Sequence, residues 1–186
     1  MNATAWKNCC ATNGMSSFAR DGMFSNACLI STLPPEFFRS VDNAFELIGK
    51  ISSSLYRIGG CDYTIPAQDA EAFLRNSAVL KKRQTSCQTG IVPGNVRALL
   101  PEPAAQAVSA ALKFFDRQLP GFIRNGKIVG VEPCVSSPLR FVRFENLMSG
   151  MPNLWLAGEG AGAAGGIMSA ACDGIRCAIA MLNHVH

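Results

Sequence analysis

The stretch NLWLAGEGAGAAGGIMSAACDGIRCA, residues 153–178, decides the fold of the C-terminal part of this chain. It opens as a short apolar run typical of a buried strand and passes through a glycine-rich turn. The apolar residues that follow predict a helix from Gly166 to about Asn183. Glycines lack Cβ atoms, so a ligand can approach the backbone closely. The first turn of the helix offers unpaired N–H groups and a positive dipole end, which favour an anionic group.

Gly160 to Gly165 spell the pattern G-x-G-x-x-G, which is the phosphate-binding fingerprint of dinucleotide-binding folds. That fingerprint requires a further strand and an acidic residue about 20 positions later, which would hold a ribose. Only 21 residues follow Gly165, and the predicted helix occupies them. The fingerprint interpretation therefore fails. Two interpretations stay open on physical grounds, a cofactor contact and a turn that lets the helix pack tightly on a sheet.

Glu159 favours the cofactor contact. Its carboxylate follows the predicted end of the strand at Ala157 and Gly158, where a ligand would lie, and a purely structural turn gains nothing from a charge there. A carboxylate accepts hydrogen bonds from sugar-like hydroxyl groups but repels phosphate. The position therefore suits the ribityl chain of a flavin better than a phosphate group.

Upstream of this segment the chain predicts mixed helices and strands. Residues 40–58 place apolar side chains at steps of three and four, which predicts an amphipathic helix with Ser40 as its N-cap. Residues 103–119 predict a second helix that opens near a proline. Residues 77–94 read as a loop, and Asn13-Gly14 reads as a hairpin turn. Strands are expected at four further places, residues 26–33, 62–66, 127–135 and 138–144.

Composition excludes several classes of protein. Apolar residues make up 48% of the chain and charged residues 16%, which indicates a folded domain rather than disorder. The net charge of +4 is scattered except at Lys81-Lys82-Arg83, which is better read as a solvated loop than as a nucleic-acid site. Charges interrupt the most apolar segment, so no membrane span is expected.

The eight cysteines contain no C-x-x-C pair, and both histidines lie at the C-terminus. This pattern favours reduced thiols and a cytoplasmic location over a disulfide framework, and it offers no metal site. Cys9 and Cys10 read as two residues of a strand. The N-terminal residues lack the charged lead and apolar run of a signal peptide.

The 153–178 stretch resembles the C-terminal flavin-binding segment of a family of FAD-dependent dehydrogenases with two dinucleotide-binding domains. The family form is a strand, A-G-E-G-A-G, A-G-G-I, S-A-A and D-G before a helix, and nearly every position matches. Four upstream stretches extend the resemblance over most of the chain: NGMSSFARDGMFSNACL at 13–29, YTIPAQDAEAFL at 63–74, LPGF at 119–122 and VSSPLRFVR at 135–143.

This resemblance implies an α+β fragment of an α/β FAD-binding flavoprotein. Residues 1–143 would form the middle, substrate-side domain, and residues 144–186 would supply the terminal strand, glycine turn and helix of the FAD domain. Family members begin with a Rossmann unit that binds the ADP half of FAD. The resemblance implies that this chain is the C-terminal part of such a protein, with the Rossmann unit missing, and we expect that unit to be its partner, in the same chain or in another.

The resemblance also assigns roles to residues. Glu159 would form hydrogen bonds with the ribityl chain or the adjoining phosphate region, and Gly158 and Gly160 would allow close approach. Gly165, Gly166 and Ile167 would bring backbone N–H groups to the flavin N1/C2=O edge. That edge becomes anionic when the flavin is reduced, so N–H donors aimed at it act like an oxyanion hole. The expected FAD contacts are Gly158, Glu159, Gly160, Gly165, Gly166 and Ile167.

Ser136, Ser137 and Arg140 are candidates for the substrate side of the flavin ring. An alternative is that the two serines form a turn before Pro138 and that Arg140 is a surface residue. The family pattern has Arg-Thr before Ser-Ser-Pro, whereas this chain has Cys134-Val135. The missing arginine removes a bidentate anion binder from the expected substrate site.

Two functions follow from these observations. The first is part of an FAD-dependent oxidoreductase, in which the chemistry belongs to the flavin. The second is a non-catalytic fragment, or a subunit that completes a flavin site with a separate Rossmann-bearing chain. The sequence identifies no catalytic residue, substrate or electron acceptor.

Overall fold

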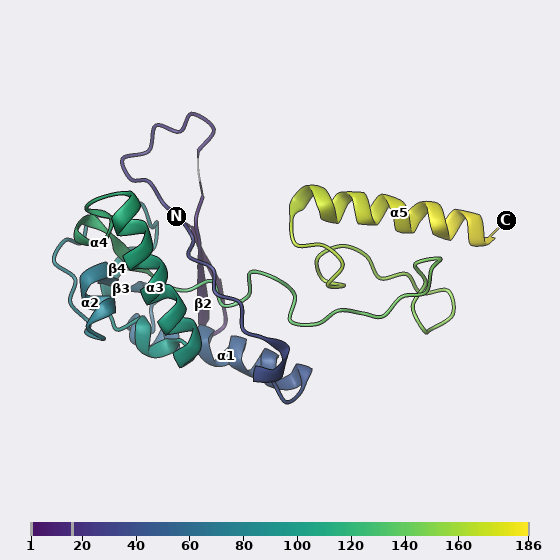
Figure 1. The fold of residues 1–186 in the computed structure, drawn as a ribbon, viewed down its shortest axis with the longest axis horizontal. Helices are drawn as coiled ribbons and strands as arrows, with labels where there is room; N and C mark the ends of the chain where they lie inside the picture. The colour runs from purple at the N-terminus through teal and green to yellow at the C-terminus, as the bar shows by residue number, and fades with distance from the viewer. Residues whose placement is uncertain (1, 16, 186) are drawn as a thin grey trace. The chain divides into compact units, whose positions relative to one another are not determined.

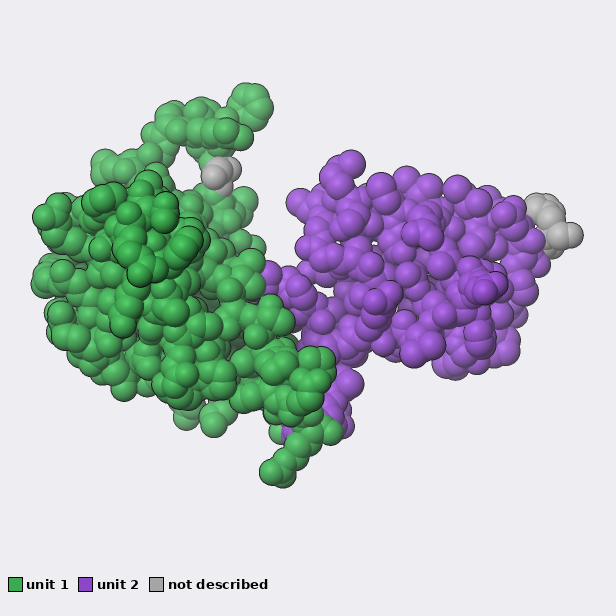
Figure 2. All heavy atoms as spheres, viewed as in Figure 1, with its two compact units in different colours: residues 1–39, 46–133 green, residues 40–45, 134–186 purple. Residues whose placement is uncertain are grey.

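The computed structural model describes residues 2–15 and 17–185, and the chain divides into two compact units. Unit 1 comprises residues 1–39 and 46–133, and unit 2 comprises residues 40–45 and 134–186 (Figure 2). The fold is α+β, as the sequence predicts. The predicted domain boundary between residues 143 and 144 stays a prediction.

Unit 1 contains a three-stranded sheet, whose strands β3 and β4 lie among the helices α2, α3 and α4 (Figure 1). Its middle strand β3 (Ile65–Asp69) pairs parallel with β4 (Ile91–Pro93) and antiparallel with β5 (Lys127–Val129). The first four residues of β3 are buried, as expected of a central strand. The other short elements of unit 1 are η1 (Pro35–Phe37), α2 (Ala70–Leu74), η2 (Arg97–Leu99) and α4 (Phe122–Asn125).

The long helices confirm the periodicity of the sequence. Helix α1 (Val41–Ile58) matches the predicted range, and the Ser40 hydroxyl accepts a hydrogen bond from the N–H of Asn43 at 3.3 Å, as an N-cap does. Helix α3 (Glu102–Gln118) opens with Pro103 in its first turn. The core of unit 1 forms two clusters. Their buried members are Cys10, Ile51, Leu55, Ile65, Ala67, Cys87 and Ile91 in one, and Ala70, Phe73 and Leu112 in the other.

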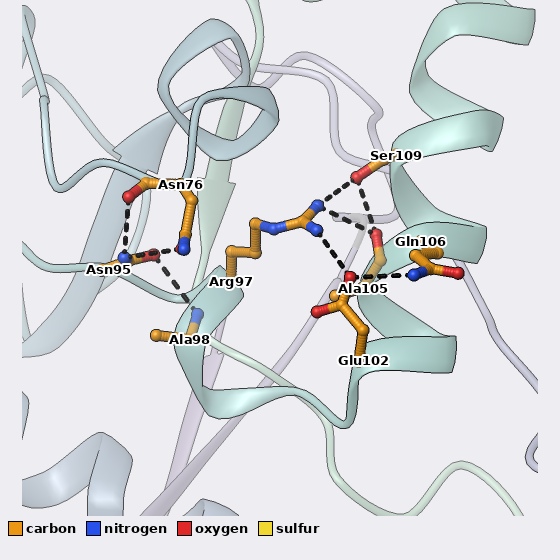
Figure 3. Close-up of polar contacts among 8 residues, drawn as sticks. All are labelled: Asn76, Asn95, Arg97, Ala98, Glu102, Ala105, Gln106 and Ser109. Carbon is orange, nitrogen blue, oxygen red and sulfur yellow. Dashed lines mark hydrogen bonds and ion pairs between the residues drawn. The ribbon is translucent and has the colours of Figure 1, made fainter.

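Arg97 ties η2 to the start of α3 (Figure 3). Its guanidinium donates to Ser109 Oγ at 2.6 Å and to the Ala105 carbonyl at 3.4 Å, and it pairs with Glu102 at 3.2 Å. It also lies 5.7 Å from the centre of the Phe73 ring. With its donors satisfied inside the fold, this arginine is a structural brace rather than a ligand-binding group.

The N-terminal hairpin corrects one turn prediction. Strands β1 (Asn2–Trp6) and β2 (Cys9–Asn13) pair antiparallel, so the turn lies at Lys7 and Asn8 and not at Asn13-Gly14. Asn8 has φ +59°, and asparagine tolerates this left-handed conformation better than most residues. Cys9 and Cys10 are residues of a strand, as predicted.

Unit 2 contains one long helix, α5 (Ile167–Val185), at the position the sequence predicts. The strand predicted at residues 153–158 is wrong, and so are those predicted at 26–33 and 138–144. Only isolated bridges form, between Arg143 and Ser149 and between Met148 and Trp155. These segments have the apolar composition of strands, but among the described residues none of them forms a hydrogen-bonded ladder with another strand. Over residues 134–184, the buried apolar side chains are Ala161 and Cys177.

Within the described residues, no helix combines the length and the apolar character needed to cross a membrane.

Burial predicts how the cysteines react. Burial, together with neighbouring Cys9 and Cys87, raises the pKa of the Cys10 thiol from 9.0 to about 11. Because the thiolate is the nucleophile, a shift of two units lowers the reactive fraction about 100-fold. We expect iodoacetamide at neutral pH to label the exposed Cys61, Cys134 and Cys172 first, and Cys10 last. Peptide mass spectrometry over a labelling time course checks this order. Equal rates in the native chain would contradict it, and urea should abolish the differences.

Candidate functional site

The segment of residues 157–166, here called the glycine loop, connects the extended chain to α5. Gly158 and Gly162 adopt left-handed conformations, with φ of +75° and +69°, which glycine enters without steric cost. The N–H of Gly162 donates to the Glu159 carbonyl at 2.8 Å, and that of Ala163 donates to the Gly158 carbonyl at 3.1 Å. The glycines are therefore needed to make a compact double turn.

Residues 134–143 lie directly against the glycine loop. The N–H of Phe141 donates to the carbonyl of Ala161 at 3.0 Å, and Ala161 is buried. Gly162 approaches this segment so closely that a Cβ at its position would lie 2.1 Å from the Leu139 carbonyl oxygen. The structure thus brings the predicted substrate-side segment and the predicted flavin-contact loop together.

An ion pair holds these parts to α5. Arg143 donates through Nη1 and Nη2 to the two carboxylate oxygens of Asp173, at 3.0 and 3.1 Å, and both side chains are largely inaccessible to water. Nη1 also approaches the Leu156 carbonyl and Cys177 Sγ. Asp173 Oδ2 accepts a second hydrogen bond, from the N–H of Gly158 at 2.9 Å. The carboxylate of Asp173, on α5, therefore binds both the glycine loop, through Gly158, and the extended segment of residues 134–143, through Arg143.

The same contacts shift the pKa values of Asp173 and Arg143. The hydrogen bond from Arg143, and then that from the Gly158 N–H, lower the pKa of Asp173 below its usual value. The Asp173 hydrogen bond raises the pKa of Arg143. Both groups therefore stay charged at neutral pH. Because the Gly158 N–H is engaged by Asp173, it does not point to a ligand, and Gly158 can contribute only its lack of a side chain.

The other predicted flavin-contact residues are accessible to solvent. Glu159, Gly160, Gly165, Gly166 and Ile167 are all exposed. A Cβ at Gly160 would meet no atom within 4 Å, so its backbone is accessible. The Ala170 N–H donates to the Gly166 carbonyl at 2.8 Å and begins the bonding ladder of α5. The N–H groups of the residues before Ala170 have no partner within the helix. The first turn of α5 carries no acidic residue.

These features fit the ring and ribityl end of a flavin. Exposed backbone at Gly160, Gly165 and Gly166 admits a flat ring edge, and a helix start without acidic residues favours the partial negative charge of that edge. The Glu159 carboxylate, at the exposed end of the loop, suits hydroxyl donors. The residues present therefore fit the group that the sequence predicts.

The predicted substrate-side residues differ in their surroundings. Ser136 is exposed, and its Oγ lies 3.9 Å from the position that a Cβ on Gly165 would occupy. Ser137 is half-buried. The carbonyl of Ser136 accepts a hydrogen bond from Cys134 Sγ at 3.2 Å. Cys134, which stands in place of the family arginine, therefore makes a local contact within residues 134–136. Arg140 is exposed and lines a pocket.

That pocket has a volume of about 540 Å³ and lies within unit 2. Its charged lining residues are Arg140, Arg143, Arg176 and Asp173. Sequence reasoning identified Arg140 but assigned no role to the other three. The signal was present, since Asp173 and Arg176 are charges inside an otherwise apolar helix, and such charges need a partner or a function.

The comparisons with known proteins define the class. A model of the family described as FAD-dependent protein, C-terminal domain-like, matches residues 1–134, which is more than half of the chain. The chain therefore belongs to this family of FAD-dependent proteins, and this membership associates it with FAD. The matched region ends before the glycine loop, so the particular contacts of the loop are not part of that match.

A relative with the description uncharacterized protein, from Clostridium beijerinckii (strain ATCC 51743 / NCIMB 8052), is 33% identical over 173 residues. The alignment covers 90% of this chain, so it extends past residue 134. It covers 32% of the relative, and the chain therefore spans about a third of that protein's length.

Proposed function

We propose that this chain forms the substrate-side domain and the ribityl and ring end of the FAD site in an FAD-dependent oxidoreductase. The observation that carries the proposal is the glycine loop, in which Glu159, the backbone of Gly160 and the start of α5 are exposed, and which packs against residues 134–143. Family membership supplies the cofactor. The fold would then be an α+β fragment of an α/β flavoprotein.

Each residue has a defined task in this proposal. When bound, FAD supplies hydride or electron transfer at its ring. Glu159 accepts hydrogen bonds from the ribityl hydroxyls, and Gly160 and Gly165 leave room for close approach. Gly166 and Ile167 present N–H groups at the ring edge, where the helix dipole stabilises negative charge. Ser136, Ser137 and Arg140 face the substrate. The Asp173 pair keeps the loop in shape.

An uncovered face of α5 supports a partner. Along the helix, several large apolar side chains are between 53% and 90% exposed, namely Ile167, Met168, Ile175, Ile179 and Leu182. An exposed apolar surface of this kind marks a contact with another protein surface. The relative is about three times the length of the aligned region. We therefore propose that the Rossmann-bearing portion of such a protein, in the same chain or in another, covers this face and binds the ADP half of FAD.

A non-catalytic role is the second candidate. Cys134-Val135 stands where the resembling family has Arg-Thr, and Cys134 is used in a local hydrogen bond. Without that arginine the chain would still complete a flavin site while lacking the family's substrate contact. Substrate-dependent reduction of a bound flavin would favour the enzyme, and a bound but unreactive flavin would favour the second candidate.

The experiment that tests the proposal compares the chain alone with the chain mixed with a separately expressed Rossmann portion of the relative. We expect the visible spectrum of bound flavin only in the mixture. A mixture that forms a complex but retains no flavin would contradict the proposal. A mixture that forms no complex would contradict the proposed partner, and the Ile175→Asp, Ile179→Asp variant serves as the reference for lost association.

Gly160→Val provides a local test of the cofactor contact. Because a Cβ at Gly160 meets no atom of the chain within 4 Å, the fold should accept the larger side chain. The valine would fill the space proposed for the flavin, so we expect flavin retention in the complex to fall at least about tenfold. Absorbance at visible wavelengths after gel filtration measures this.

Gly150→Ala is the matched control, since its Cβ also meets nothing within 4 Å but lies outside the glycine loop. It should retain flavin like the unmodified chain. Equal flavin retention by Gly160→Val and Gly150→Ala would place the cofactor elsewhere.

A further inference from the structure

The pocket beside the glycine loop has a charge pattern that the flavin contacts do not use. Its lining places three arginines against one aspartate, which gives a formal charge of +2. Asp173 is already committed, because its two oxygens accept from both terminal nitrogens of Arg143 and from the Gly158 N–H. The hydrogen-bonding oxygens of Asp173 are therefore occupied, and Arg176 acts on this carboxylate only through its charge. The surplus positive charge belongs to Arg140 and Arg176.

Those two arginines are available to a ligand. Both are exposed, and within the described residues neither guanidinium makes a hydrogen bond or an ion pair. Arg140 lies in the extended segment and Arg176 on α5, so the pocket is held between two elements that the Arg143–Asp173 pair fixes to each other. Two guanidinium groups at one pocket suit a carboxylate or phosphate, which each can bind in a bidentate manner.

The remaining walls are apolar. They comprise residues of the segment that follows Arg140 and one residue of the glycine loop, namely Phe141, Val142, Phe144, Leu147 and Ala163. An inorganic anion would leave these side chains without a partner. A ligand with an apolar body next to its anionic group would cover them and would use both halves of the pocket.

We propose that this pocket binds an organic anion, an apolar or aromatic body that carries a carboxylate or phosphate, held by Arg140 and Arg176. The pocket includes Ala163 of the glycine loop and lies where the proposed substrate side of the flavin begins. That the anion is the substrate rests on the proposed function. The proposal that the pocket binds organic anions depends only on the residues that line it, and not on the proposed function.

Binding of phenyl phosphate to the full 186-residue chain tests the proposal by calorimetry at low ionic strength. We expect saturable binding that is tighter than that of inorganic phosphate, and no binding of benzylamine, which has a similar ring but a positive charge. The Arg140→Gln, Arg176→Gln variant should bind phenyl phosphate at least about tenfold more weakly, because it loses two charge-assisted contacts. Arg124→Gln, an exposed arginine of unit 1, is the control and should bind like the unmodified chain.

Phe141→Ala separates the apolar wall from the charges. It should lower the affinity for phenyl phosphate towards that for inorganic phosphate and leave the latter unchanged. Unaltered phenyl phosphate binding in the double arginine variant would overturn the proposal. Absence of saturable binding by the unmodified chain would overturn it as well.

Competition with ADP distinguishes the substrate from the cofactor's own diphosphate. If ADP displaces phenyl phosphate, the pocket serves the cofactor, and the substrate assignment is wrong. The flavin-retention experiment with the Rossmann portion gives the separate test of the proposed function. The double arginine variant should retain flavin there while it loses phenyl phosphate, so the two proposals fail independently.

Discussion

Replacing Gly162 with alanine should unfold unit 2 while the core of unit 1 persists. The new Cβ would lie 2.1 Å from the Leu139 carbonyl oxygen and 2.7 Å from Arg140 Cα, and both are backbone atoms that cannot rotate away. A left-handed φ at a non-glycine residue costs on the order of 1–3 kcal/mol by itself. The clash adds to this cost, and unit 2 has little apolar burial with which to offset it.

Gly158→Ala is the matched control for that clash. Gly158 has a similar φ of +75°, but its Cβ would approach no atom closer than 3.7 Å. It should show only the backbone strain, about 1–3 kcal/mol. Gly174→Ala, in open space within α5, should leave unit 2 intact or stabilise it by about 0.5–1 kcal/mol.

The chain carries its own reporters for this experiment. One tryptophan, Trp6, lies in unit 1, and the other, Trp155, lies in unit 2. Trp155 donates to the Asn146 carbonyl at 3.3 Å and contacts the His184 ring. In a Trp6→Phe background, the fluorescence of Trp155 in urea follows unit 2 alone. Identical unfolding of the Gly162→Ala and Gly158→Ala variants would show that the close approach has no energetic weight.

Breaking the Arg143–Asp173 pair should give the second large effect. Asp173→Asn leaves the arginine without its counter-charge in a place that is largely closed to water. Removal of one partner of such a pair costs about 3–5 kcal/mol when the pair is deeply buried. Because this pair borders a pocket, we expect about 2–3 kcal/mol. The Arg143→Met, Asp173→Leu double variant should recover part of the loss, since it leaves no uncompensated charge.

Acid should weaken the same contact. The pKa of Asp173 is lowered in the folded chain, chiefly by Arg143 and then by the Gly158 N–H. The stabilisation is therefore complete above the ordinary aspartate pKa of about 3.9 and is lost as the pH falls from there through the lower folded-state value. Urea unfolding followed through Trp155 should show this loss in the unmodified chain and not in Asp173→Asn.

Glu145→Gln removes an exposed carboxylate of the same unit and serves as the control for both measurements. It should change neither the stability at neutral pH nor the acid dependence. An Asp173→Asn variant that matches Glu145→Gln in stability would contradict the role of the ion pair.

The helices could be predicted because their signals are local. The steps of three and four in residues 40–58, the Ser40 cap and the proline near the start of α3 each act within a few residues, and all three are observed. The glycine loop and α5 were placed for the same reason. The conformations of Gly158 and Gly162 follow from residue type within a short turn.

The strand predictions were wrong where pairing depends on residues that are distant in the sequence. Residues 153–158 have a strand's composition, but a strand exists only through hydrogen bonds to another segment, and Trp155 finds only one bridge. The hairpin failed because two turn candidates competed, and the pairing of β1 with β2 placed the turn at Lys7 and Asn8 rather than at the stronger local signal.

The candidate site divides in the same way. The position of the glycine loop was predictable from its glycines, whereas the assignment of its residues and of Ser136 to the flavin and the substrate stays a prediction. The Arg143–Asp173 pair spans 30 residues, and no local pattern specifies which arginine an isolated aspartate will meet. The pocket could not be predicted either, because the contact between Arg143 and Asp173 brings its lining residues together.

The uncovered face of α5 bears on how the protein is kept in the cell. A helix with apolar side chains open to water is the feature that chaperones and proteases recognise in incompletely assembled proteins. If the proposed Rossmann-bearing partner covers this face, a copy that lacks it would be removed, and the amount of this chain would follow the amount of that partner. Where the two are separate polypeptides, the exposed face of α5 would thereby limit the amount of this chain to the amount of its partner.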